Sequence, residues 1–202
     1  QYIYQKVHTY NLTMTYEELL KTTMIFEKIA CIDSKLIKRC EKMLDFYDFE
    51  YKDKHTFLIS ASLINIGKMS ISNEITNKAT PLNEDEYEQI KNYPYFTEQV
   101  LSQIMGFKEI STWAGRIQEN LDGSGYPYGL GANELSFKDR LMAVLHRYNA
   151  LRSKKAYRDA YNHHEAMREL KLMARYGKLE LSVIDDLNEK LKPETMSNSS
   201  VS

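Results

Sequence analysis

The stretch Asp122–Leu130 reads DGSGYPYGL and is the most distinctive part of the chain. Half of the chain's eight glycines lie in it or directly after it, and Pro127 stands among them. Glycine adopts positive-φ conformations that other residues take only at a cost, and proline fixes its own φ. Glycine-rich turns between helices are common, but nine residues make a long one. We therefore interpret the stretch as a signature loop, on which Tyr126 and Tyr128 are held in one shape.

The chain on both sides of this loop shows helical spacing of apolar residues. From Thr15 onward they recur every three or four positions, and no alternating strand pattern of useful length is present. One helix is expected over 137–151, and another pair should be interrupted at Pro94. The side chains expected to face inward include Leu36, Ile37, Cys40, Met43, Leu44, Ile90, Val100, Leu101, Ile104, Leu181, Ile184 and Leu187. The pattern predicts an all-α, single-domain helical bundle over 14–192.

The two ends of the chain lack this periodicity. Residues 1–13 are expected to be a linker from an upstream domain, since the sequence begins with Gln1 and not with Met. Residues 193–202 are expected to be a disordered tail. The first helix, expected over 15–30, pairs with its copy in a homodimer under one interpretation and packs on its own domain under the default one.

Composition excludes several classes of function. Of the 202 residues, 43% are hydrophobic and 27% charged, which is ordinary for a globular protein, and the net charge is −1. The charge balance gives no argument for a nucleic-acid polymer or an anionic membrane as partner. No apolar run reaches the length of a membrane span. Cys31 and Cys40 fall among apolar neighbours and are expected to be free thiols, as in a cytoplasmic protein.

The loop resembles the GYP motif of the HD-GYP family, helical metal-dependent phosphohydrolases that degrade cyclic di-GMP. Three more segments resemble that family in the right order: LINIGKMSI at 63–71, KATPLNEDEYEQIKNYP at 78–94 and RLMAVLHRYNALRSKKAYR at 140–158. The resemblance covers roughly residues 15 to 191 and implies a bundle of the HD-GYP type. It also implies a centre of two or three metal ions, bound by histidines and aspartates, that activates water.

At the positions where the family keeps its metal ligands, this sequence has other residues. The substituted positions are Ile64, Asn65, Tyr93, Ile117, Gln118, His146 and Asn149, whereas the glutamate after the histidine pair is kept as Glu119. The upstream His-Ser pair aligns less firmly with Asp33 and Ser34. Asn and Gln are weak neutral ligands, and two positions have become isoleucine, whose burial stabilises a core by about 2 kcal/mol each. We expect no metal and no cofactor, and a domain that is not an enzyme.

Three cations fall on motif positions that the resemblance associates with cyclic di-GMP phosphates: Lys68, Lys155 and Arg158. Lysine in place of arginine at position 155 loses the bidentate fork and keeps the charge. In a chain with 27 Lys and Arg, surface cations are the commoner explanation. The loop residues that the resemblance assigns to partner contacts are Asp122, Gly123, Ser124, Gly125, Tyr126 and Pro127.

Two other histidine positions are candidates for chemistry. His163, His164 and Glu165 copy the family's HHE triplet, but they lie far downstream of the loop, where capping of a helix start is the better interpretation. His146 is expected to be an ordinary histidine with satisfied hydrogen bonds, since no nucleophile is visible beside it.

The sequence leaves three functions open, in this order. The first is a catalytically inactive regulatory or protein-interaction module in bacterial cyclic di-GMP signalling, whose loop binds GGDEF domains or other signalling proteins. The second is a sensor that binds cyclic di-GMP through Lys68, Lys155 and Arg158 without hydrolysing it. The third is a residual metal-dependent phosphodiesterase with a rebuilt site.

Overall fold

The computed structural model describes residues 34–76, 78–155 and 158–191. The predictions for 1–13, 15–30, Cys31, Asp33 and the tail lie outside these residues. In chain order, the helices are α3 (Ser34–Phe46), α4 (Tyr51–Leu63), the 3-10 helix η1 (Ile66–Ser70), α5 (Asn73–Thr76), α6 (Glu84–Lys91), α7 (Tyr93–Ser102), α8 (Lys108–Gly115), α9 (Phe137–Leu151), α10 (His163–Arg175) and α11 (Leu181–Lys190).

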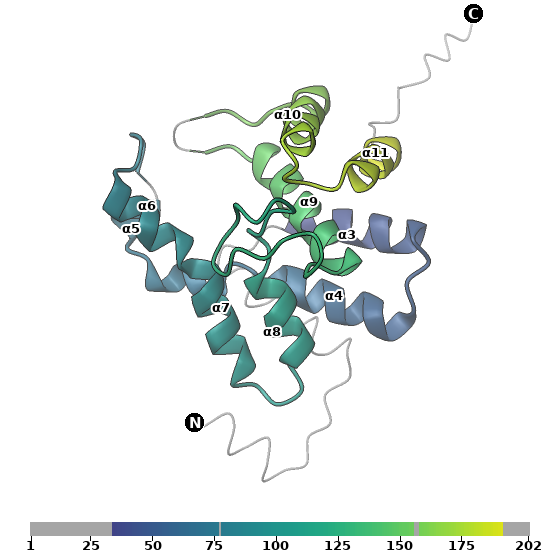
Figure 1. Ribbon diagram of the computed structural model, residues 1–202, viewed down its shortest axis with the longest axis horizontal. Coiled ribbons are helices and arrows are strands. Elements are labelled where there is room, and N and C mark those ends of the chain that lie inside the picture. The colour runs from purple at the N-terminus through teal and green to yellow at the C-terminus, as the bar shows by residue number, and fades with distance from the viewer. Residues whose placement is uncertain (1–33, 77, 156–157, 192–202) are drawn as a thin grey trace, which may run out of the picture.

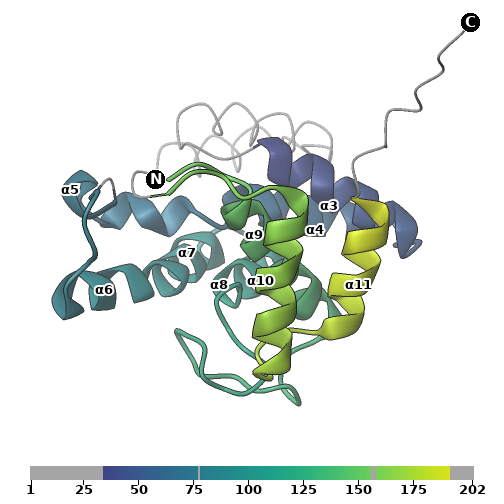
Figure 2. The same ribbon diagram turned by 90° about the horizontal axis from the view of Figure 1, so that it is seen from above.

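The described helices form one bundle with α9 at its centre. Helix α9 packs against α3, α8, α10 and α11, while α4 packs against α3 and α8. Helix α7 packs on α8 and on η1. Helices α5 and α6 lie at one end of the molecule and α11 lies at the other (Figures 1 and 2). Within the described ranges, extended pairing is limited to two isolated bridges, Asp122 with Gly131 and Lys155 with Arg158. The predicted all-α bundle is confirmed.

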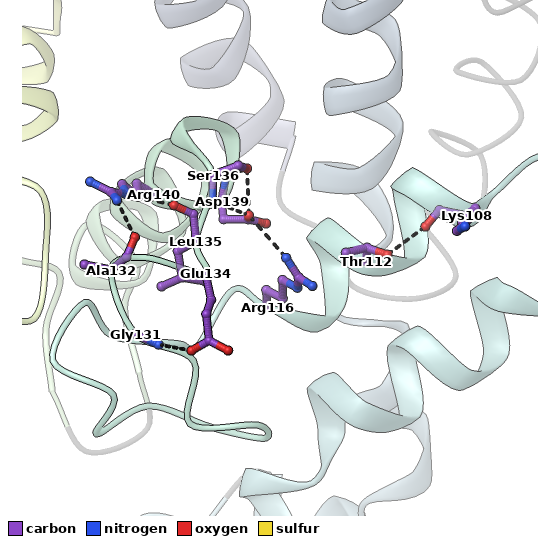
Figure 3. Close-up of polar contacts among 10 residues, drawn as sticks. All are labelled: Lys108, Thr112, Arg116, Gly131, Ala132, Glu134, Leu135, Ser136, Asp139 and Arg140. Atoms are coloured by element: carbon purple, nitrogen blue, oxygen red, sulfur yellow. Dashed lines mark hydrogen bonds and ion pairs between the residues drawn. The ribbon is translucent and has the colours of Figure 1, made fainter.

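Helix boundaries follow from residues that satisfy the free backbone groups of the first turn. Helix α9 begins, as predicted, at Phe137, and its capping box is formed by Ser136 and Asp139: Asp139 Oδ2 accepts from Ser136 N at 2.9 Å. Figure 3 shows this helix start and its neighbours. Arg140 donates to the carbonyl of Ala132 at 2.5 Å, and Arg116 from the end of α8 lies 3.6 Å from Asp139 Oδ2. These contacts tie the end of the glycine-rich loop to the helix that carries His146.

The predicted break at Pro94 is confirmed, since Pro94 lies in the first turn of α7, directly after α6 ends. The inward direction predicted for Val100, Ile104 and Leu181 is wrong: these side chains are 50%, 44% and 50% exposed. Leu101 fills the contact of α7 with the bundle, at 1% exposure, so Val100 turns outward. Ile104 lies past the end of α7 and Leu181 is the first residue of α11, where packing is incomplete.

Two further features bear on the predicted environment. Cys40 is fully buried in the core and is a free thiol, as expected. Among the described helices, none combines the length and the apolar composition needed to cross a membrane. The cytoplasmic location stays a prediction.

Candidate functional site

The glycine-rich loop is fastened by the buried carboxylate of Glu119. Its Oε1 accepts from Tyr128 N at 2.7 Å and its Oε2 from Leu130 N at 2.9 Å. Burial raises the pKa of this carboxyl, while the backbone N–H groups of the loop act in the opposite direction. The glutamate that the sequence retains therefore holds the shape of the loop, because both of its oxygens are occupied by backbone donors.

The front of the loop is closed by short-range contacts. Asp122 Oδ1 accepts from Ser124 N at 3.0 Å, and Asn120 Nδ2 donates to Ser124 Oγ at 3.0 Å. Gly125 lies so close to the backbone of residues 119–120 that an added Cβ would stand 2.4 Å from Asn120 N. The peptide bond between Tyr126 and Pro127 is cis. The loop is thus one fixed element, and its contact with partner proteins stays a prediction.

Two of the substituted ligand positions are part of the hydrophobic core. Ile64 at the end of α4 and Ile117 after α8 are both 0% exposed. Tyr93, also buried, accepts a hydrogen bond on its hydroxyl from Gln118 Nε2 at 2.9 Å. Burial raises the pKa of the Tyr93 phenol, so it is a neutral group at physiological pH. These four positions therefore carry neutral side chains, and the two isoleucines belong to the core.

Two other positions leave polar atoms without a partner among the described residues. They are Asn65 Oδ1, at the start of η1, and His146 Nδ1, on α9. The prediction of an ordinary, satisfied His146 is therefore wrong. Burial lowers the pKa of this imidazole well below its usual value, and the charges of Lys68, Arg147 and Lys155 lower it further. His146 is a neutral imidazole with one open ring nitrogen, and a buried polar atom of this kind calls for water or a ligand.

Lys68 is placed at the site by the close contact of η1 with α7. Gly67 N donates to Thr97 Oγ1 at 3.0 Å, and a Cβ on Gly67 would stand 2.1 Å from Tyr93 O. Only glycine permits this approach, which sets the Lys68 ammonium over the Tyr93 ring at 4.8 Å from its centroid. Burial, with the charge of Lys155 as second cause, lowers the pKa of Lys68 to about 8.

Arg147 is a residue of the site that sequence reasoning missed. It donates to the carbonyls of Ile117 and Glu119 at 3.2 and 3.1 Å and to Asn120 Oδ1 at 2.8 Å. Burial lowers its pKa, while Glu119 is one of the groups that act in the opposite direction. The sequence signal that could have identified Arg147 is a cation directly after His146, within the apolar pattern of the helix that became α9. Arg147 positions the segment leading into the loop and adds positive charge behind His146.

The other two predicted cations have different surroundings. Lys155 is exposed on the connection from α9 to α10, and its charge acts on both Lys68 and His146. Arg158 donates instead to the carbonyls of Ala150 and Asp159 at 3.2 and 2.8 Å and stacks on the Tyr161 ring. Lys155 is therefore linked to Lys68 and His146 by its charge, whereas the Arg158 guanidinium binds backbone carbonyls of the connection.

The residues present do not fit the metal centre that the resemblance implies. Within 34–76, 78–155 and 158–191, no group of three or more His, Cys, Asp or Glu side chains is arranged to hold a metal ion. Hydrolytic metal sites use His and carboxylate donors, whereas the positions here offer isoleucine, amides, a phenol and one imidazole surrounded by cations. His163, the first residue of the HHE-like triplet, shares hydrogen bonds with the Tyr148 hydroxyl and Asn188 Oδ1. It lies at the start of α10, whose capping box is formed by Asn162 and Glu165.

A separate cavity of about 10 Å³ lies between the end of α8, the start of α9 and the connection to α11. Arg116, Asp139 and Arg140 are among its lining residues, and Asp139 Oδ1 has no hydrogen-bond partner among the described residues. The space suits about one water molecule and is too small for a nucleotide. The site of Lys68, His146 and Lys155 is therefore the candidate for ligand recognition.

A family model described as HD domain matches residues 11–182 of the chain. The chain belongs to the HD domain family. Three curated relatives give this HD domain a context. The 3'3'-cGAMP-specific phosphodiesterase 3 of Vibrio cholerae is 36% identical over 101 residues, covering 50% of this chain and 22% of that protein.

A second relative, 3'3'-cGAMP-specific phosphodiesterase 1 of the same bacterium, is 25% identical over 177 residues, covering 84% of the HD domain chain and 41% of that protein. The cyclic di-GMP phosphodiesterase PdeB of Borreliella burgdorferi is 33% identical over 110 residues, covering 54% and 29%. The chain thus spans between 22% and 41% of the length of these three relatives.

A solved structure, Bd1817, a HDG"Y"P protein from Bdellovibrio bacteriovorus, superimposes with a TM-score of 0.63 and 17% identity, covering 78% of this chain and 50% of that one. At that identity the match shows the fold alone. The relatives' names contradict the prediction that the domain is not an enzyme, because all three are named as phosphodiesterases. That prediction rested on the substituted ligand positions. These substitutions show that the metal donors have changed, but they do not decide whether the domain catalyses a reaction.

Proposed function

We propose that this HD domain acts in cyclic dinucleotide signalling and binds a cyclic dinucleotide at the site of Lys68, His146 and Lys155. The observation that carries the proposal is the convergence of two lysine charges on a buried imidazole whose Nδ1 has no partner among the described residues. An anionic ligand would suit this arrangement, because its negative charge offsets the repulsion between the cations and its oxygens accept hydrogen bonds from the ammonium groups. The relatives' names give the class of that anion.

The number and type of the charges support this ligand class. A cyclic dinucleotide carries two phosphodiester groups with one negative charge each, and Lys68 and Lys155 supply two ammonium groups that bind phosphate as point charges. Burial and then the phenol of Tyr87 on α6, which is 49% exposed, raise the pKa of Tyr126 in the loop. Aromatic rings of this kind offer stacking surfaces for the bases of a nucleotide.

Phosphodiester hydrolysis is the reaction class that we propose, following the names of the relatives. In it, a water oxygen joins the phosphorus, one bridging P–O bond breaks, and a linear dinucleotide results. The described site offers charge neutralisation at the phosphate through Lys68 and Lys155, and the proton of the attacking water passes to the leaving oxygen.

Titration calorimetry with cyclic di-GMP and 3'3'-cGAMP, together with chromatography of the incubated nucleotide, tests the proposal. We expect micromolar binding of at least one of the two and the appearance of its linear product. Absence of binding for both nucleotides would contradict the proposal as a whole. Binding without product over prolonged incubation would contradict its hydrolytic part and leave recognition as the function.

A further inference from the structure

The positive charge of this site comes from the protein's own side chains. Lys68, Arg147 and Lys155 all act on His146, and burial is the leading cause of its lowered pKa. For Lys68, the resolved charge interaction is repulsion from Lys155. The carboxylate that raises the pKa of Arg147 is that of Glu119, whose two oxygens accept hydrogen bonds from Tyr128 N and Leu130 N.

This charge pattern is the reverse of a divalent metal site. A site for divalent cations gathers carboxylates and neutral imidazoles, so that the anionic ligands offset the charge of the metal. Here three cations lower the pKa of the candidate imidazole, after burial as the first cause, and Ile64 and Ile117 occupy two of the implied ligand positions with fully buried apolar atoms. Cations placed there repel a dication and attract a phosphate.

We propose that this site holds the phosphates of a cyclic dinucleotide with Lys68 and Lys155 and needs no divalent metal ion to do so. The inference rests on the proposed function, since it names the means by which that same site binds its ligand. The two lysines take the place of the metal charge that the resemblance implies, while Arg147 fixes the segment behind them through Ile117 O, Glu119 O and Asn120 Oδ1.

The unpartnered atoms support the same conclusion. His146 is 9% exposed, and its Nδ1 has no hydrogen-bond partner among the described residues. Asn65 Oδ1 also lacks a hydrogen-bond partner there. Water ordered around an anion held by the lysines would donate to Asn65 Oδ1, and an oxygen of the anion would accept from His146 Nδ1 when that nitrogen carries the imidazole proton. A carboxylate at position 65 would instead place negative charge beside the phosphates.

The test is calorimetry of the full chain with cyclic di-GMP, first after dialysis against a chelator and then with added Mn²⁺. We expect the same affinity within about twofold in both, because the binding charge is on the protein. Lys155→Gln should weaken binding about 10-fold or more, as for loss of a charge-assisted hydrogen bond, and Lys154→Gln should not. Lys154 is the matched control, with a side chain 80% exposed that pairs with Asp159.

The isosteric variant Asn65→Asp separates the two explanations further. With lysine-held phosphates it should weaken binding about fivefold or more in chelator, through repulsion between like charges. Binding that appears only with Mn²⁺, or an Asn65→Asp variant that binds more tightly with Mn²⁺ than the wild type, would overturn the inference and leave the proposed function standing. Absence of binding under every condition would overturn the proposed function, and this inference with it.

Discussion

The positive charge of Lys155 acts on Lys68, although η1 and the α9–α10 connection are far apart in the chain. Together with burial, it lowers the pKa of Lys68 to about 8. Two cations held in this way repel each other as long as no anion lies between them. This repulsion is therefore expected to lower the stability of the free protein, and a bound phosphate should relieve it.

Lys68→Met should stabilise the free protein and weaken cyclic dinucleotide binding. Methionine keeps much of the buried stem and removes the charge, so that the gain from desolvation and lost repulsion outweighs the lost cation–π contact with Tyr93. We expect about 1 kcal/mol, or a rise in Tm of about 2–4 °C, by thermal unfolding. Lys52→Met, at an exposed position of α4, is the control. A lower Tm with unchanged binding would contradict the functional assignment of Lys68.

Binding should weaken as pH rises from 7 to above 8, because the Lys68 ammonium loses its proton near its lowered pKa of about 8. His146 stays neutral over this range, since its pKa lies well below the usual value. In the free protein the sign is opposite: between about 8 and the usual lysine pKa the unfolded chain binds more protons, so stability rises with pH. Calorimetry from pH 6.5 to 9.5 measures the first effect, and equal affinity at both ends would disprove it.

Glu119→Gln should loosen the loop. The amide nitrogen of glutamine would face a backbone donor at Tyr128 or Leu130, so one buried hydrogen bond is lost and another is weakened. We expect a loss of about 1–3 kcal/mol in the free energy of unfolding, measured with denaturant. Glu134→Gln is the matched control, since Glu134 is exposed and accepts from Gly131 N at 3.0 Å. An equal loss of unfolding free energy in both variants would show that the buried position of Glu119 does not cause the destabilisation.

The helices could be predicted from apolar periodicity because the core faces of α3, α9 and α11 repeat regularly. The substituted positions 64 and 117 were also correctly expected in the core. The roles of individual charges could not be predicted in the same way. Arg158 matches a motif position, but it donates its hydrogen bonds to the carbonyls of Ala150 and Asp159. Arg147 matches no motif position, yet it binds Asn120 in the segment that leads into the loop.

The reason is that a motif fixes the place of a residue in the chain, whereas its partners come from distant segments. Val100 and Ile104 continue the apolar pattern of α7, and only the packing of that helix on α8 and η1 decides that they face outward. The prediction that the domain is not an enzyme rested on the missing metal donors, and it is contradicted by relatives that are named as phosphodiesterases.

Gly67→Ala should displace Lys68 from the site. The added methyl group would stand 2.1 Å from Tyr93 O and 2.7 Å from Thr97 N, and neither backbone atom can yield without moving α7. We expect a loss of about 1–3 kcal/mol in stability, as for an overpacked core, together with weaker ligand binding. Gly131→Ala is the control, because its new methyl group meets Leu121 O at 3.7 Å. A fully stable Gly67→Ala variant would contradict the tight contact of η1 with α7.

The most direct measurement for the central claim is a side-by-side titration of cyclic di-GMP into wild type, Lys155→Gln and Lys154→Gln at one pH and low salt. The two lysines are neighbours in sequence, but Lys155 acts on Lys68 and His146, whereas Lys154 pairs with Asp159 in solvent. We predict an affinity about 10-fold or more lower for Lys155→Gln, with little change for Lys154→Gln. Equal affinities for all three proteins would contradict the assignment of this site.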